Sequence, residues 1–64
     1  MYCLAKAPFN YYVYGESTKV KTFIEGNYNV EWKLQFFPSE SSLLIDVNTI
    51  SDGPDTKIVN LLNR

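Results

Sequence analysis

The sequence contains no histidine and a single cysteine, Cys3. Histidine is the commonest general base and metal ligand in proteins, so its absence removes the usual starting point for an active site. One cysteine cannot form an internal disulfide, and without histidine partners it cannot complete a structural zinc site. No imidazole can activate the thiol, so we expect Cys3 to be an inert, partly buried side chain.

Other features that carry catalytic chemistry are missing as well. No glycine-rich phosphate loop, calcium-binding loop or other motif with a known mechanism occurs in the chain. Glu31 and Asp46 would face the same side of the sheet expected below, where paired carboxylates can serve in acid and base catalysis. Lys21 and Lys33 would neutralise that surface through cross-strand pairs. We therefore expect a protein that is not an enzyme and that binds no metal or cofactor.

Long apolar runs and an excess of one charge are also absent. No segment approaches the roughly 18 apolar residues of a membrane span, and the start of the chain lacks the basic and apolar regions of a secretory signal. Six lysine and arginine residues against seven aspartate and glutamate residues give a net charge of −1, which disfavours a nucleic-acid partner. These features predict a cytoplasmic, intracellular protein without membrane association.

Aromatic residues, by contrast, are abundant: one tryptophan, five tyrosines and four phenylalanines occur among 64 residues. A chain of this length makes one domain, residues 1–64, and buries only about 60% of the surface that its unfolded form exposes. Large aromatic side chains allow a few residues to supply the buried area of such a small core. A hydrophobic fraction of 45% argues against disorder.

Segments rich in β-branched and aromatic residues alternate with turn signals along the chain. Clusters of glycine, proline, serine and aspartate break the sequence roughly every 8 to 12 residues, a spacing typical of β-hairpins. The pattern predicts a mostly β fold, a small antiparallel β-meander of four to five strands. The expected strands are 10–14, 18–24, 28–37 and 43–50, with a further short strand at 2–6.

The stretch YNVEWKLQF at 28–36 alternates strictly between apolar and polar residues, so its strand should have one dry and one wet face. A two-residue turn at Gly26 and Asn27 would put the apolar residues of 18–24 on the wet face, whereas an odd-numbered loop puts them on the dry face. We therefore expect residues 20, 22 and 24 to share a face with 28, 30, 32, 34 and 36. Phe23 conflicts with this register. The expected core is Phe23 or Ile24, Val20, Tyr28, Val30, Trp32, Leu34, Phe36, Leu43, Ile45, Val47, Ile58, Leu61 and Leu62.

The segment 54–63 has two interpretations. Ile58, Leu61 and Leu62 have helical spacing, and Gly53-Pro54-Asp55 resembles a helix start, which favours a short C-terminal helix packed on the sheet and hence an α+β fold. The β-branched run 56–59 favours a strand that forms a hairpin with 49–51. The helical interpretation is slightly preferred.

The cluster Asn10-Tyr-Tyr-Val-Tyr14 exceeds what a small core needs. Neighbouring strand residues point to opposite faces, so at least one of Tyr11, Tyr12 and Tyr14 should reach the surface. Tyrosine is favoured where one protein buries against another, although a strand covered on both sides would also explain the cluster. The candidate contact residues for a protein partner are Tyr11, Tyr12, Tyr14, Lys21, Glu31 and Lys33.

These observations favour a small protein-binding module. A phage-encoded inhibitor or modulator of a host protein would fit the size of the chain and its bias toward residues with AT-rich codons. The alternatives are a β-domain that binds single-stranded nucleic acid by base stacking, and a structural or accessory subunit of a larger assembly. An open sheet also leaves exposed edges, through which strand addition by a partner or homodimerisation by edge pairing can occur.

Overall fold

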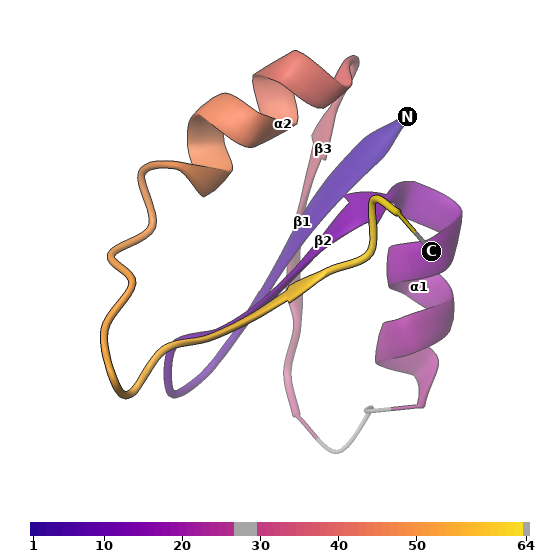
Figure 1. Cartoon of the computed structure of the whole chain (residues 1–64). Helices are drawn as coiled ribbons and strands as arrows, with labels where there is room; N and C mark the ends of the chain where they lie inside the picture. The colour runs from indigo at the N-terminus through magenta and orange to yellow at the C-terminus, as the bar shows by residue number, and fades with distance from the viewer. Residues whose placement is uncertain (27–29, 64) are drawn as a thin grey trace.

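Two helices cover opposite faces of a four-stranded mixed sheet in this computed structural model, which describes residues 1–26 and 30–63 (Figure 1). The elements in chain order are β1 (Tyr2–Ala7), β2 (Tyr11–Glu16), α1 (Ser17–Glu25), β3 (Lys33–Phe37), α2 (Glu40–Val47) and β4 (Lys57–Asn60). The strand order β3-β1-β2-β4 places β3 and β4 at the two edges. β1 pairs antiparallel with β2 and with β3, and β4 runs parallel to β2.

The hairpin of β1 and β2 forms the centre of the sheet because both strands are apolar on both faces. Cys3 and Ala5 face one side and Leu4 the other, and each is at most 1% exposed. On β2, Val13 is buried on the side of Cys3, and Tyr14 is buried on the side of Leu4. Strands without an alternation of apolar and polar residues are typical of sheet positions that are covered on both faces.

Helix α1 follows β2 without a loop. The Glu16 carboxylate accepts a hydrogen bond from the Thr18 backbone N–H at 3.0 Å, which caps the first turn. This hydrogen bond holds the pKa of Glu16 below its usual value, because it stabilises the charged form. Val20, Phe23 and Ile24 have i, i+3, i+4 spacing and pack together on the side of the sheet that carries Cys3.

Helix α2 begins directly after β3. The Ser39 side chain accepts a hydrogen bond from the Ser42 backbone N–H at 3.2 Å, and Glu40 lies in the first turn, where a negative charge suits the helix dipole. Leu43 is fully buried on the sheet, with Leu44 and Val47 packed beside it. Ile45 points away from the sheet and is 67% exposed.

The core is split by the sheet into two clusters. On the α1 side the buried residues are Cys3, Ala5, Val13, Val20 and Leu61. On the α2 side they are Leu4, Tyr14, Phe37 and Leu43. The helices do not cover the sheet evenly, since α1 packs on β2 and β1, whereas α2 packs on β1 and β3.

The expected fold class is therefore confirmed only at the level of α+β, and the antiparallel meander is wrong. The strands expected at 2–6 and 10–14 are present as β1 and β2. The strand expected at 18–24 lies within α1, and that expected at 43–50 is helical up to Val47. A capping side chain, Glu16 for α1 and Ser39 for α2, precedes helical apolar spacing in each segment.

The C-terminal expectation is also wrong in its preferred form. Lys57–Asn60 is a strand, and it pairs in parallel with β2 instead of forming a hairpin with 49–51. The long segment between β3 and β4, which contains α2, supplies the crossover that parallel pairing requires.

The expected register fails because 18–24 does not pair with 28–37 as a strand. Of that second range only residues 33–37 form β3, and Tyr28 lies outside the described residues. Val20, Leu43 and Leu61 are buried as expected, whereas Ile45 is exposed and Val30, Leu34 and Phe36 are 37–45% exposed. The expected core residues that are partly buried are Phe23, Ile24, Trp32, Val47, Ile58 and Leu62.

Candidate protein-binding surface

β3 lies at one edge of the sheet. On its outer side it has no neighbouring strand in the described part of the chain. The direction of its backbone groups follows from the opposite edge, where the Leu61 N–H donates to the Tyr14 carbonyl at 2.8 Å. Even-numbered residues of β2 therefore face β4 and odd-numbered ones face β1. The odd-numbered residues of β1 are the register partners of those of β2, so the even-numbered residues of β1 turn their backbone groups toward β3. Leu4 and Gln35 are therefore a hydrogen-bonded pair.

The same alternation turns the N–H and C=O groups of Leu34 and Phe36 away from the sheet. We call these groups, together with the side chains of Leu34 and Phe36, the β3 edge. The two side chains are 38% and 45% exposed, on the face of the sheet that carries α1. They are exposed because α1 packs mainly over β2 and β1 and places only the Lys21 side chain over Phe36.

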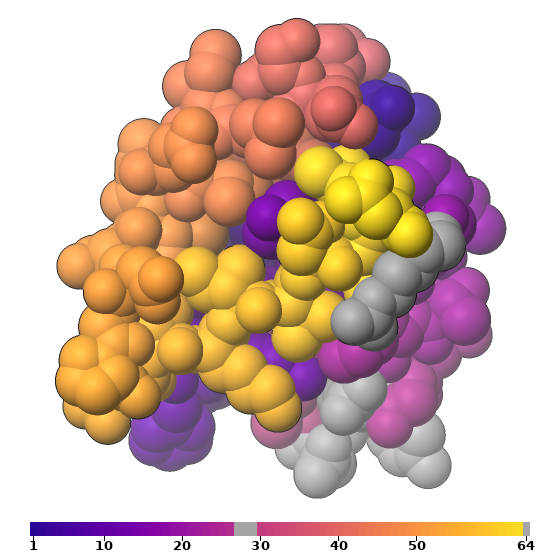
Figure 2. All heavy atoms as spheres, viewed as in Figure 1, coloured from indigo at the N-terminus to yellow at the C-terminus, as the bar shows by residue number. Residues whose placement is uncertain are grey.

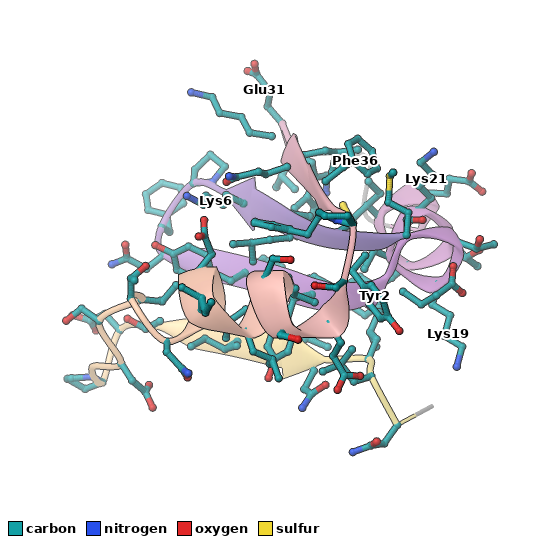
Figure 3. All side chains as sticks on the ribbon, turned by 90° about the horizontal axis from the view of Figure 1, so that it is seen from above. Tyr2, Lys6, Lys19, Lys21, Glu31 and Phe36 are labelled. Atoms are coloured by element: carbon teal, nitrogen blue, oxygen red, sulfur yellow. The ribbon has the colours of Figure 1, made fainter. Side chains whose placement is uncertain are left out.

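Lys21 of α1 is the side chain placed over this uncovered apolar surface. Its Nζ lies 5.3 Å from the centre of the Phe36 ring, within cation–π range. Figure 3 shows Lys21 and Phe36 on neighbouring parts of the molecule, with Glu31 at the outer end of the chain segment that leads into β3. The α1 side of the β3 edge is therefore apolar with a positive charge beside it.

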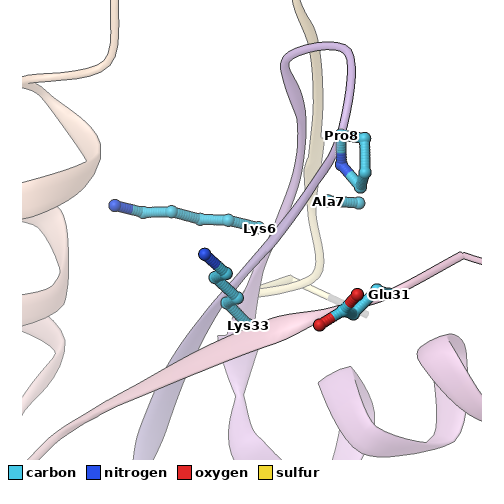
Figure 4. A pocket seen from close by; sticks show the side chains of 5 residues that line it. All are labelled: Lys6, Ala7, Pro8, Glu31 and Lys33. Atoms are coloured by element: carbon cyan, nitrogen blue, oxygen red, sulfur yellow. The ribbon is translucent and has the colours of Figure 1, made fainter.

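On the opposite face, two lysines lie directly across from one another. Lys6 of β1 is the register partner of Lys33 of β3, and like charges in this position are destabilising. Both line a hollow of about 390 Å³ together with Ala7, Pro8 and Glu31. Figure 4 shows the Lys6 and Lys33 side chains pointing toward the side of α2, with the Glu31 carboxylate set apart from their amino groups.

The structure does not bring the six predicted contact residues together. Tyr14 is buried and Tyr12 is partly buried, both in the α2-side cluster. Tyr11 is partly buried on the other side, where its ring lies 5.0 Å from that of Trp32 and under the Lys57 amino group. The remaining three residues, Lys21, Glu31 and Lys33, all lie beside β3.

The residues that sequence reasoning missed are Leu34 and Phe36 as surface groups, and Lys6. Leu34 and Phe36 were expected in the core because they continue an alternation of apolar and polar residues. Their local sequence does not reveal that α1 packs mainly on β2 and β1. A signal for Lys6 did exist, since a lysine within the apolar segment YCLAKA marks a strand end that leaves the core.

The remaining features are the single cysteine, the acidic side chains and the length of the helices. Burial raises the pKa of the Cys3 thiol, and its side chain is fully buried, whereas partial burial was expected. The described residues contain no cluster of three or more cysteine, aspartate or glutamate side chains able to hold a metal ion. Within the same part of the chain, every helix is too short or too polar to cross a membrane.

The tip of the β1–β2 hairpin carries the most exposed aromatic ring in the described residues. Phe9 is 94% exposed, and both Phe9 (φ 66°) and Asn10 (φ 59°) have left-handed backbone conformations. Asparagine tolerates this conformation, but a bulky aromatic residue does not adopt it readily. Phe9 is thus a strained turn residue beyond Ala7, outside the paired residues of β1.

No protein-family model matches the chain, and no curated protein or solved structure matches it. Functional conclusions therefore depend on the surface of this chain alone.

Proposed function

We propose that this chain is a non-enzymatic protein-binding module, which takes an extended segment of another protein onto the β3 edge. The observation that carries the proposal is the coincidence of two properties in the same residues. Leu34 and Phe36 have outward-facing backbone groups and also expose large apolar side chains. Main-chain hydrogen bonds and alternate side-chain contacts are what strand addition to a sheet edge requires.

An open apolar edge is otherwise a liability. Exposed edge strands are usually blunted by proline, by bulges or by inward-pointing charges, because they pair with other chains. Pro38 follows β3 directly but does not interrupt it, and the β3 side chains on the α1 face are both apolar. A partner strand would cover this surface and continue the sheet outward.

A single-stranded nucleic acid is the competing partner, but the tyrosine cluster does not support it. Stacking needs exposed rings above a positive groove. Tyr14 is buried, and Tyr11 packs against Trp32 beneath Lys57, so the tyrosine cluster serves the fold. An inhibitor of a host protein and an accessory subunit of an assembly are both consistent with strand addition.

The proposal can be tested by capture of partners from a cell lysate with three matched baits. The Leu34→Pro variant lacks the outward N–H, while the hydrogen bonds of Lys33 and Gln35 to β1 are kept. The Leu34→Val variant keeps the N–H and an apolar side chain. Proteins captured by wild type and Leu34→Val but lost with Leu34→Pro support binding at this edge. The same proteins captured equally by all three baits contradict it.

A further inference from the structure

We infer that the segment accepted by the β3 edge is acidic, with apolar and acidic residues in alternation. This inference rests on the proposed function, and adds to it the chemistry of the partner. The charged side chains placed beside β3 by their contacts are Lys6, Lys21, Lys33 and Glu31. Three of these four side chains are positive, although the whole chain carries a net charge of −1.

The two faces of β3 call for different residues in the partner. On the α1 face, a strand added beside β3 would place its side chains next to Leu34 and Phe36, so apolar residues fit there. On the α2 face, its side chains would lie next to Lys33, with Lys6 one strand further in. Carboxylates in these positions would offset the repulsion between two lysines that lie directly opposite one another.

Alternation follows because successive residues of a strand point to opposite faces. A partner segment with apolar residues on the α1 face must therefore carry its acidic residues at every second position. Lys21, whose Nζ lies over the Phe36 ring, adds a positive charge to the apolar face and favours a further acid at one end of the segment.

The same charges argue against a second copy of this chain as the occupant. Two β3 strands paired antiparallel about Gln35 would set Leu34 opposite Phe36 of the other copy, which is favourable for packing. They would also bring two copies of Lys21 to one face of the joint sheet, each beside its own Phe36. Like charges across an interface oppose association, so an acidic partner is preferred.

Three capped heptapeptides provide defined probes, in which isoleucine alternates with glutamate, glutamine or lysine. Binding to the full chain can be followed by the fluorescence of Trp32, the only tryptophan, which precedes β3 directly. We expect the glutamate peptide to bind at least tenfold more tightly than the lysine peptide, with the glutamine peptide between them. In Lys33→Gln this preference should shrink several-fold, and in the matched control Lys19→Gln, a residue of α1 away from β3, it should not change.

The outcomes separate the chemistry of the partner from the proposed function itself. Equal affinity for all three peptides, lost in Leu34→Pro, would leave strand addition standing and overturn the acidic preference. Failure of every peptide to bind, or equal binding by Leu34→Pro, would overturn strand addition as well. Concentration-dependent dimers in sedimentation equilibrium that Leu34→Pro abolishes would identify a second copy as the occupant and contradict the acidic partner.

Discussion

β3 and β4 both lie at an edge of the sheet, but their outward-facing residues differ in character. The residues of β4 whose backbone groups face outward are Ile58 and Asn60, because Lys57 and Leu61 donate to β2. Just past the strand the Asn60 side chain accepts a hydrogen bond from the Leu62 N–H at 2.8 Å. In Figure 2 the chain around β4 and the segment before it run across the face nearest the viewer.

On β3 the outward-facing residues Leu34 and Phe36 carry exposed apolar side chains. The Lys21 side chain of α1 lies over the Phe36 ring, and no described strand pairs with the outer side of β3. Of the outward-facing residues of β4, Ile58 is partly buried and Asn60 is polar. Those of β3 are apolar and 38–45% exposed. An edge left open and apolar in the same molecule therefore points to a partner.

The largest expected effect tests whether β3 has an inner and an outer side. Gln35→Pro removes a hydrogen bond to β1, so we expect it to lower the free energy of unfolding by about 1–3 kcal/mol. Leu34→Pro removes an outward N–H and should cost less than about 1 kcal/mol. Urea denaturation followed by circular dichroism measures both, and equal losses would mean that the strand sides have been assigned wrongly.

The second prediction concerns the packing of the β4 edge against β2. A Cβ at Gly15 would lie 2.9 Å from the Leu61 Cβ, and the Gly15 φ of +156° is unfavourable for other residues. Gly15→Ala should therefore lower the free energy of unfolding by about 1–3 kcal/mol. Gly53→Ala is the matched control, since its Cβ would meet nothing nearer than 4.0 Å. A neutral Gly15→Ala in thermal unfolding would show that β4 packs more loosely on β2 than described.

The third prediction separates mere exposure from edge exposure. Phe9 is more exposed than Leu34 or Phe36 but is not part of an open edge. Phe9→Asn replaces a strained left-handed residue with one that tolerates this conformation, so we expect stabilisation by roughly 1 kcal/mol. Affinity for the glutamate heptapeptide should not change. Loss of that affinity in Phe9→Asn would move the binding surface to the hairpin tip.

The smallest effect is expected at the cap of β4. Asn60→Ala leaves the Leu62 N–H without its side-chain acceptor and should lower the free energy of unfolding by about 0.5–1.5 kcal/mol. Hydrogen exchange of the Leu62 amide should accelerate at the same time. An unchanged exchange rate at Leu62 would show that the Asn60 side chain does not hold this amide.

Sequence alone predicted the strands at 2–6 and 10–14 and the burial of Val20, Leu43 and Leu61, because these depend on local apolar content. It missed both helices, although Val20, Phe23 and Ile24 have helical spacing, since β-branched residues outweighed that signal. The sequence did not predict the edge position of β3. Leu34 and Phe36 are exposed because α1 packs mainly on β2 and β1, and this packing is a property of the tertiary structure.

The candidate surface was predicted in part for a similar reason. Lys21, Glu31 and Lys33 do lie beside one strand, although the pairing expected between them is wrong, because Lys21 belongs to a helix. The tyrosines are amphipathic, and their sequence pattern does not reveal which face of β2 a helix will cover. Tyr14 is buried because α2 and its cluster close over that face.

Hydrogen exchange of individual backbone amides, with and without the glutamate heptapeptide, tests the central claim most directly. If the β3 edge accepts a strand, the Leu34 and Phe36 amides should exchange at least tenfold more slowly with peptide present. The Lys33 and Gln35 amides, already bonded to β1, and the amides of β4 should change little. Protection confined to β4 or to the hairpin tip, or none at Leu34 and Phe36, would contradict the account.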